Sequence, residues 1–192
     1  MKKDGRFLSA VLIILCVTLV AAVIPTDAEA AIYEDTVRLH IRARSDSETD
    51  QAVKLTIRDK ILEKYAYTPT PCSKNEAEAM IYARLSEIED DVNFWLEELG
   101  CEYGCEVRLT EEWFETRDYG EYSLPAGVYT SLIIELGGGE GQNWWCVMYP
   151  PMCHEVAIGK SVAYTGEETR LIYGGRYAVK FKLLELAASL AK

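Results

Sequence analysis

The chain has 192 residues, of which 49% are apolar and 27% are charged, and its formal net charge is −11 at pH 7. This composition is typical of a globular protein with one well-buried domain, and it excludes a long disordered chain. A surface with this much negative charge repels nucleic acid and anionic lipid headgroups, so DNA or RNA binding is excluded.

The N-terminus has the order of a secretory signal peptide. Basic residues precede an apolar stretch, residues 7–24, and the small-residue triplet Ala28-Glu29-Ala30 follows. This order predicts cleavage between Ala30 and Ala31. An uncleaved stretch of this length could also just span a bilayer, so membrane contact is expected only through residues 7–24. We expect residues 1–30 to be a signal peptide or an uncleaved anchor, and residues 31–192 to form a single exported domain.

Residues 36–43 alternate between apolar and polar side chains, which predicts a half-buried strand. His40 lies on the polar face and is expected to be a solvated or hydrogen-bonded surface group. The next residues, Ser45-Asp46-Ser47-Glu48, match the S-x-x-E capping box and predict the start of a helix. The apolar stripe of this helix is Val53, Ile57, Ile61 and Tyr65, widened by Leu55 and Leu62.

A second amphipathic helix is expected from about Asn75 to Leu99, with Gly100 ending it. Its apolar stripe is Ile81, Leu85, Ile88, Val92, Trp95 and Leu99. The two helices are expected to pack as a hairpin against a sheet.

Beyond Gly104 the apolar pattern changes to a period of two, which predicts strands. One begins at Cys105, an apolar strand covers residues 128–136, and the glycine-rich residues 137–141 predict a hairpin turn before a returning strand at 144–149. Residues 154–175 are expected to be loop, followed by a last strand and a C-terminal helix. This order of elements predicts an α+β fold with a helical hairpin on a largely antiparallel sheet.

Residues 143–153, Asn-Trp-Trp-Cys-Val-Met-Tyr-Pro-Pro-Met-Cys, form the most unusual segment of the chain. Trp144 and Trp145 are half of the four tryptophans in the protein. Neighbouring residues of a strand point to opposite faces. We therefore expect one indole to enter a core and the other to meet solvent or a partner.

Removal of the leader would leave five cysteines: Cys72, Cys101, Cys105, Cys146 and Cys153. Export permits disulfides, and an odd number leaves at least one sulfur free, metal-bound or intermolecular. Cys146 with Cys153 is the first pair expected, because the Pro-Pro pair between them favours a turn; this short cross-link would stabilise by roughly 2.5 kcal/mol. Pairing of Cys72 with Cys101 or Cys105 is an alternative.

No motif for catalysis or for a cofactor stands out. The glycine-rich segment precedes an aromatic strand, whereas a phosphate-binding loop opens a helix. The cysteine spacing is not that of a zinc site. We therefore expect no enzyme, no cofactor and no metal. Acidic residues beside Trp113 leave an alternative, an exported cell-wall glycan-binding protein or a hydrolase using Glu111, Glu112 or Glu115.

Several segments together resemble the stage II sporulation protein R family of endospore-forming bacteria. Besides the leader, the resemblance is carried by residues 38–47, Asp50, Gln51, Lys54, Leu55, and residues 107–109, 124–129 and 139–153. The family usually has asparagine where this chain has Arg44, and phenylalanine is commoner than Tyr149. Cys72, Cys101 and Cys105 lie outside the pattern.

The resemblance implies a signalling protein and not an enzyme. It implies secretion across the forespore membrane into the space between forespore and mother cell, and activation there of a membrane-embedded aspartyl protease, stage II sporulation protein GA, which processes pro-sigma-E. The aromatic-rich patch suits a protein contact. The residues expected to contact this partner, or to build the contact surface, are Asp46, Asp50, Asn143, Trp144 and Trp145.

Overall fold

The computed structural model describes residues 9, 11–14, 16–17, 27–65, 71–119 and 123–150. The chain divides into two compact units, one of residues 32–113 and 128–165 and one of residues 1–31, 114–127 and 166–192. Within the described residues, no helix is both long and apolar enough to cross a membrane. The strand and helix expected after residue 175 lie outside the described residues.

A four-stranded sheet organises the first unit. Its strands are β1 (Val37–Arg42), β2 (Cys105–Phe114), β5 (Gly127–Leu136) and β6 (Asn143–Tyr149), in the order β2-β5-β1-β6. β1 is parallel to β5 and antiparallel to β6. Gly137 N, just after β5, donates to Gly104 O, just before β2, at 2.9 Å. The end of one strand therefore meets the start of the other, and β2 and β5 run antiparallel.

Two of the three strand pairings are thus antiparallel, and helices lie separately along the chain. This confirms the α+β fold with a largely antiparallel sheet. A further two-stranded sheet is formed by β3 (Arg117–Asp118) and β4 (Ser123–Leu124).

The prediction that the strands at residues 128–136 and 144–149 pair with each other as a hairpin is wrong. β1 lies between β5 and β6, so the glycine-rich loop must cross the end of β1 to reach β6. Neighbouring strands lie about 4.8 Å apart, so this loop spans roughly twice that distance. Gly137, Gly138 and Gly139 have φ angles of 57°, 93° and 65°, a region that glycine enters without steric cost.

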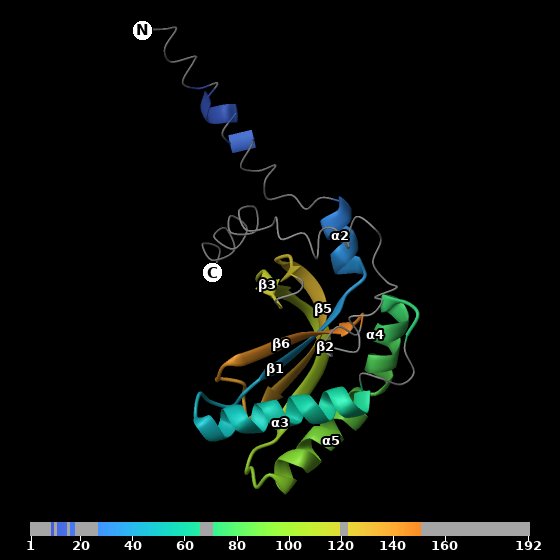
Figure 1. Cartoon of the computed structure of the whole chain (residues 1–192), viewed down its shortest axis with the longest axis vertical. Helices are drawn as coiled ribbons and strands as arrows, with labels where there is room; N and C mark the ends of the chain where they lie inside the picture. Colours follow the sequence, from blue (N-terminus) through green and yellow to red (C-terminus); the bar gives the residue numbers. More distant parts are fainter. Residues whose placement is uncertain are drawn as a thin grey trace. The chain divides into compact units, whose positions relative to one another are not determined.

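Helices α3 (Glu48–Tyr65), α4 (Lys74–Ala83) and α5 (Leu85–Glu98) pack on one face of the sheet; Figure 1 shows α3 lying across the strands with α5 beside it. The single helix expected over residues 75–99 is therefore wrong. It is interrupted at Arg84, whose backbone has φ −112° and ψ 6° and whose N–H donates to Ile81 O and Tyr82 O. The Arg84 guanidinium lies over the Tyr65 ring at 4.5 Å and pairs with Glu87. The apolar stripe continues through the break, so the pattern does not reveal it.

The core lies between these helices and the apolar face of the sheet. The expected residues Val53, Ile57 and Ile61 of α3 are buried in it. Leu55 and Leu99 were expected in the apolar stripes, yet they are 39% and 41% exposed. Leu96 is buried in place of Leu99. Gly100 follows α5 with φ 75°, which confirms it as the stop signal of that helix.

α2 (Asp27–Glu34) precedes β1 and crosses the predicted cleavage position. Ile32 in its last turn is fully buried.

Candidate functional site

The unusual segment at residues 143–153 contributes β6, an edge strand of the sheet among the described residues. Trp144 pairs with Ile41 of β1 and packs against the hydrophobic core, with the Arg58 guanidinium 5.2 Å from its ring centre. Trp145 pairs with His40 and stacks on its imidazole at 5.5 Å. The expectation that the two indoles serve opposite faces is confirmed, and Trp144 is the one on the core side.

His40 lies at the centre of the polar face, under the Trp145 ring. Its Nδ1 donates to Glu112 Oε2 at 2.7 Å, because a carboxylate can only accept. Its Nε2 lies 2.9 Å from Asn143 Oδ1. His40 is only 4% exposed, so the prediction of a surface group is wrong, although it is hydrogen-bonded. The reason is the central position of β1, which buries both of its faces.

Two arginines extend this network. Arg42 donates to Glu112 at 2.5 Å and to Glu135 at 2.7 Å. Arg108 forms a bidentate pair with Glu135 at 2.6 and 2.9 Å. Such charge-assisted bonds from planar guanidinium groups fix both carboxylates in place. We call His40, Arg42, Arg108, Glu112, Glu135 and Asn143 the polar network.

Both carboxylates of the polar network are held in their charged form. Burial alone would raise the pKa of Glu112, but the hydrogen bonds and charges of His40 and Arg42 outweigh it and lower that pKa. The hydrogen bond from Arg108 lowers the pKa of Glu135. A glycoside hydrolase needs one carboxylic acid with a raised pKa. Glu112 does not supply it, and Glu111 and Glu115 are exposed.

Two loops meet at the edge of the sheet where β1 ends and β6 begins. We call residues 43–47 and residues 137–142 together the loop pair. Gly141 N donates to Ala43 O at 2.8 Å, and Ala43 N donates to Gln142 O at 3.4 Å. A Cβ atom at Gly141 would lie 2.3 Å from Ser45 O. Only glycine therefore permits this approach of the two backbones.

Asp46 and Asp50 are expected to contact a partner, and the structure gives both an internal role in the loop pair. Asp46 Oδ1 accepts from Gln142 N at 2.7 Å. Asp50 accepts from Ser45 Oγ at 2.5 Å and from Tyr103 Oη at 2.9 Å. The hydrogen bond from Ser45 is the main cause that lowers the Asp50 pKa. The two carboxylates therefore tie the loops to each other and to α3.

The N-cap of α3 lies two residues beyond its expected position. Asp50 N donates to Ser47 Oγ at 3.1 Å, and α3 begins at Glu48. Ser47 is therefore the N-cap, and the expected role of Ser45 as N-cap is wrong. Ser45 Oγ instead accepts from Ser47 N at 3.2 Å and donates to Asp50.

Lys54 is also a member of this site; the sequence named it for the family resemblance but not as a site residue. Its ammonium donates to Gln142 O at 3.0 Å and to Gln51 Oε1 at 2.6 Å. Burial lowers its pKa, and the side chain is only 5% exposed. A signal was present in the sequence, because Lys54 lies beside Val53 and one turn before Ile57 on the buried side of the helix.

Tyr103, Glu112 and Glu135 also belong to the site, and of these only Glu112 was named from the sequence, as a candidate acid of the alternative hydrolase. Their contacts with Asp50, His40 and Arg108 join segments that are distant in sequence. Local patterns carry no signal for such pairs.

The cysteines are only partly described. Cys146 is buried and disulfide-bonded, whereas Cys153 lies outside the described residues, so the pairing of these two stays a prediction. Cys72, Cys101 and Cys105 are free thiols. Burial raises the Cys105 pKa to about 12, which keeps it protonated and unreactive. Among the described residues, no group of three or more potential ligands is placed to hold a metal ion.

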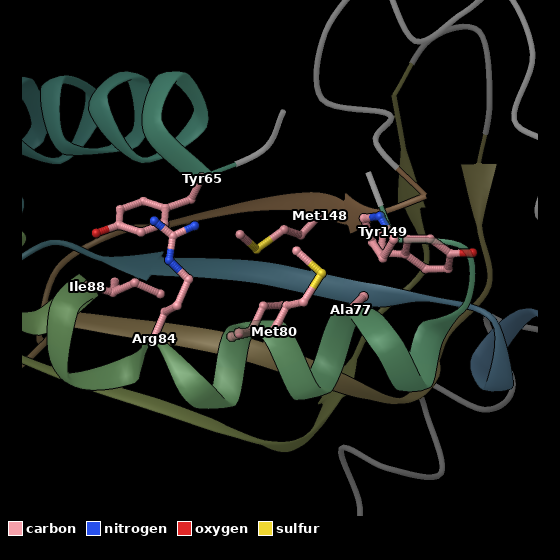
Figure 2. A pocket seen from close by; sticks show the side chains of 9 residues that line it. Tyr65, Ala77, Met80, Arg84, Ile88, Met148 and Tyr149 are labelled. Carbon is pink, nitrogen blue, oxygen red and sulfur yellow. The ribbon is translucent and has the colours of Figure 1, made fainter. Parts of the chain in front are cut away.

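The other end of β6 borders a small apolar pocket that is partly open to solvent (Figure 2). Met148 and Tyr149 of β6 face Met80 and Ala77 of α4 across it, and Arg84 closes one side. The pocket contains none of the predicted partner residues. These lie at the start of β6 and in the loop pair.

The segments with the most specific sequence patterns, residues 38–47 and 139–149, therefore pair along β1 and β6 and cross in the loop pair. The family model described as stage II sporulation protein R matches residues 33–158, a range that includes both segments. The chain belongs to this sporulation family.

One curated relative is stage II sporulation protein R of Bacillus subtilis (strain 168), which is 37% identical over 121 residues. The match covers 62% of this chain and 54% of the relative, so the chain spans about half the length of the curated relative it matches. No solved structure matched the chain.

Proposed function

We propose that the protein is a secreted signal of endospore formation and not an enzyme. In this proposal it crosses the forespore membrane and acts in the space between forespore and mother cell. Its partner is the mother cell's membrane-embedded aspartyl protease, stage II sporulation protein GA, which then processes pro-sigma-E. A ligand of this kind activates its receptor by binding the active state better than the inactive one.

The proposal rests on family membership and on the spatial proximity of the two segments that carry the most specific sequence patterns. Residues 38–47 and 139–149 converge on the loop pair and the start of β6 through contacts that cross the chain. Extensive internal hydrogen bonding makes this region a rigid surface, and rigidity lowers the entropic cost of binding a partner.

The structure separates the predicted partner residues by position. Asn143 is exposed and Trp145 is half-buried on the polar face. We propose that these two contact the receptor directly. Trp144 packs against the core, and Asp46 and Asp50 fasten the loop pair, so we propose that these three build the surface.

A disulfide from Cys146 to Cys153 completes the proposal. It would hold the segment after β6 near the buried part of the strand. This disulfide would lie away from the loop pair. Its removal is therefore expected to lower the stability of the fold more than the affinity for the receptor.

The decisive experiment is co-expression of the chain with the protease and pro-sigma-E in a host that does not sporulate. Processing of pro-sigma-E that depends on the chain is the expected result. Absence of processing, with all three proteins shown to be present and the chain exported, would contradict the proposed function.

A Trp145→Ala variant tests the contact surface in the same assay. Trp113 provides a matched control, because it is also a partly exposed tryptophan on a strand but lies outside the patterned segments. We expect Trp145→Ala to abolish processing, since buried aromatic anchors dominate protein contacts. Trp113→Ala should leave processing unchanged. Equal processing by both folded variants would move the contact surface elsewhere.

A further inference from the structure

The predicted leader cleavage site lies inside a helix of the folded protein. Cleavage is expected between Ala30 and Ala31, and α2 runs without interruption from Asp27 to Glu34. The bond therefore has a helical backbone in the structure, although a protease binds its substrate as an extended segment that has opened locally.

The residues directly after this bond make specific contacts within the unit that contains the four-stranded sheet. Ile32 is fully buried, and its carbonyl accepts from Thr36 Oγ at 2.5 Å. The Tyr33 ring meets the Tyr129 ring edge-on at 5.1 Å. Tyr33 O accepts from Lys74 Nζ at 3.1 Å. Contacts to Thr36, to β5 and to α4 thus begin within two residues of the bond.

We propose that docking of α2 protects the Ala30–Ala31 bond, so that leader removal and folding compete. To extend the bond, a membrane signal peptidase must withdraw Ile32 and Tyr33 from these contacts. In the cleavage step water adds across the peptide bond, which leaves a carboxylate on Ala30 and an amino group on Ala31. Chains cut before α2 docks are released, and chains that fold first keep the leader.

The cleaved product retains the docking contacts, because Ile32, Tyr33 and Thr36 all follow the cut. Released and tethered proteins then share one folded surface and differ only in how far they can travel from the membrane. This competition depends on α2 and the leader alone, and it holds whatever the receptor is.

The test uses the full-length protein, folded with its leader in detergent micelles, and purified signal peptidase. A synthetic peptide of residues 15–45 serves as the unfolded reference. We expect the folded protein to be cut at least about tenfold more slowly than the peptide. Cleavage of both at the same rate would overturn the proposal, and so would a peptide that is not cut after Ala30.

Two variants separate docking from general stability without changing the recognition sequence. Tyr129→Ala removes the ring that holds Tyr33, and Lys74→Met removes the ammonium that holds its carbonyl. Both should be cut faster than the original protein. Ile57→Ala is the control, because Ile57 is fully buried in α3 and belongs to the core cluster.

The Lys74→Met variant keeps the test valid if Tyr129→Ala does not fold, since Lys74 is the first residue of α4 and is not a member of the core cluster. Urea unfolding of each variant gives its global stability. If Ile57→Ala accelerates cleavage as much as Lys74→Met does, the bond opens by global unfolding and local protection is refuted.

Discussion

The two faces of the four-stranded sheet carry opposite chemistry on the same strands. On the helix-covered face, Leu39 lies between Leu132 and Cys146 of its neighbours, and the contacts are apolar. On the other face, Arg42 lies between Glu135 and Asn143, and the contacts are ion pairs and hydrogen bonds. The apolar face stabilises by excluding water. The polar face instead fixes the orientation of groups at the start of β6.

The two faces also differ in how freely their side chains can be replaced. Apolar side chains can exchange with one another at small cost when volume is kept. Members of the polar network cannot, because each buried charge needs its own partner in place. A surface for specific recognition is therefore better supported from the polar side, and Trp145 and Asn143 lie there.

The largest effect is expected on the apolar face. Leu39 is fully buried in the middle of β1, so Leu39→Ala leaves a cavity and should lower the free energy of unfolding by about 2–5 kcal/mol. Urea unfolding followed by tryptophan fluorescence measures it. A loss below about 1 kcal/mol would mean that the helices do not pack on this face as described.

The next largest loss of stability is expected on the polar face, at substitutions that leave a charged group without its partner. Glu112→Ala leaves His40 and Arg42 without their shared acceptor, at a cost of about 2–3 kcal/mol. Glu106→Ala is the matched control on the same strand, because Glu106 is largely exposed and meets Arg108 at 3.4 Å. Its loss should stay below about 0.5 kcal/mol. Similar losses in the two variants would show that the polar network is merely a solvated face.

The apolar face was largely predictable from sequence, and the polar face was not. Alternation of Val37, Leu39 and Ile41 identifies the side that meets the core, and the spacing of Val53, Ile57 and Ile61 identifies the helix face that covers it. Alternation does not show what neighbours the remaining side. His40 was therefore predicted to be a surface group, because the sequence does not show that β1 lies between two other strands.

The sequence identified only some of the residues that form the candidate site. Asn143, Trp145, Asp46 and Asp50 belong to unusual local patterns, and all four make contacts in the region described. Their roles depend on the insertion of β1 between β5 and β6, which no turn signal encodes. The glycine-rich loop shows this limit, because its glycines mark a sharp turn but not the strand that the turn crosses.

One added methyl group should be enough to disrupt the loop pair. Gly141→Ala would place a methyl group against Ser45 O and separate the two loops, with an expected loss of about 1–3 kcal/mol. Gly138→Ala provides the control, because a Cβ there meets no atom within 4 Å and adds only the strain of its positive φ, about 1 kcal/mol. In the processing assay, Gly141→Ala should reduce activity more than Gly138→Ala. Equal activity would mean that the loop pair does not support the contact surface.

Acid should weaken the contacts of the polar face. The pKa values of Glu112 and Glu135 are lowered in the folded protein, so the folded state binds their protons less readily than the unfolded state. Their contribution to stability is present above the unfolded pKa of about 4.3 and is lost as the pH falls through the folded values. The stability difference between the original protein and Glu135→Gln should therefore shrink as the pH falls below about 4.3. A constant difference over that range would show that Glu135 gains nothing from its charge.

The smallest effect is expected where the helix pattern misidentified a core residue. Leu55 lies on α3 two positions before Ile57, but it is 39% exposed and points away from the apolar face. Leu55→Gln keeps a good helix former and should change the free energy of unfolding by less than about 0.5 kcal/mol. Ile57→Ala, on the same helix and fully buried, should cost about 2–5 kcal/mol. If Leu55→Gln also costs more than 1 kcal/mol, Leu55 is covered in the folded protein, and the apolar face extends further around α3 than these contacts indicate.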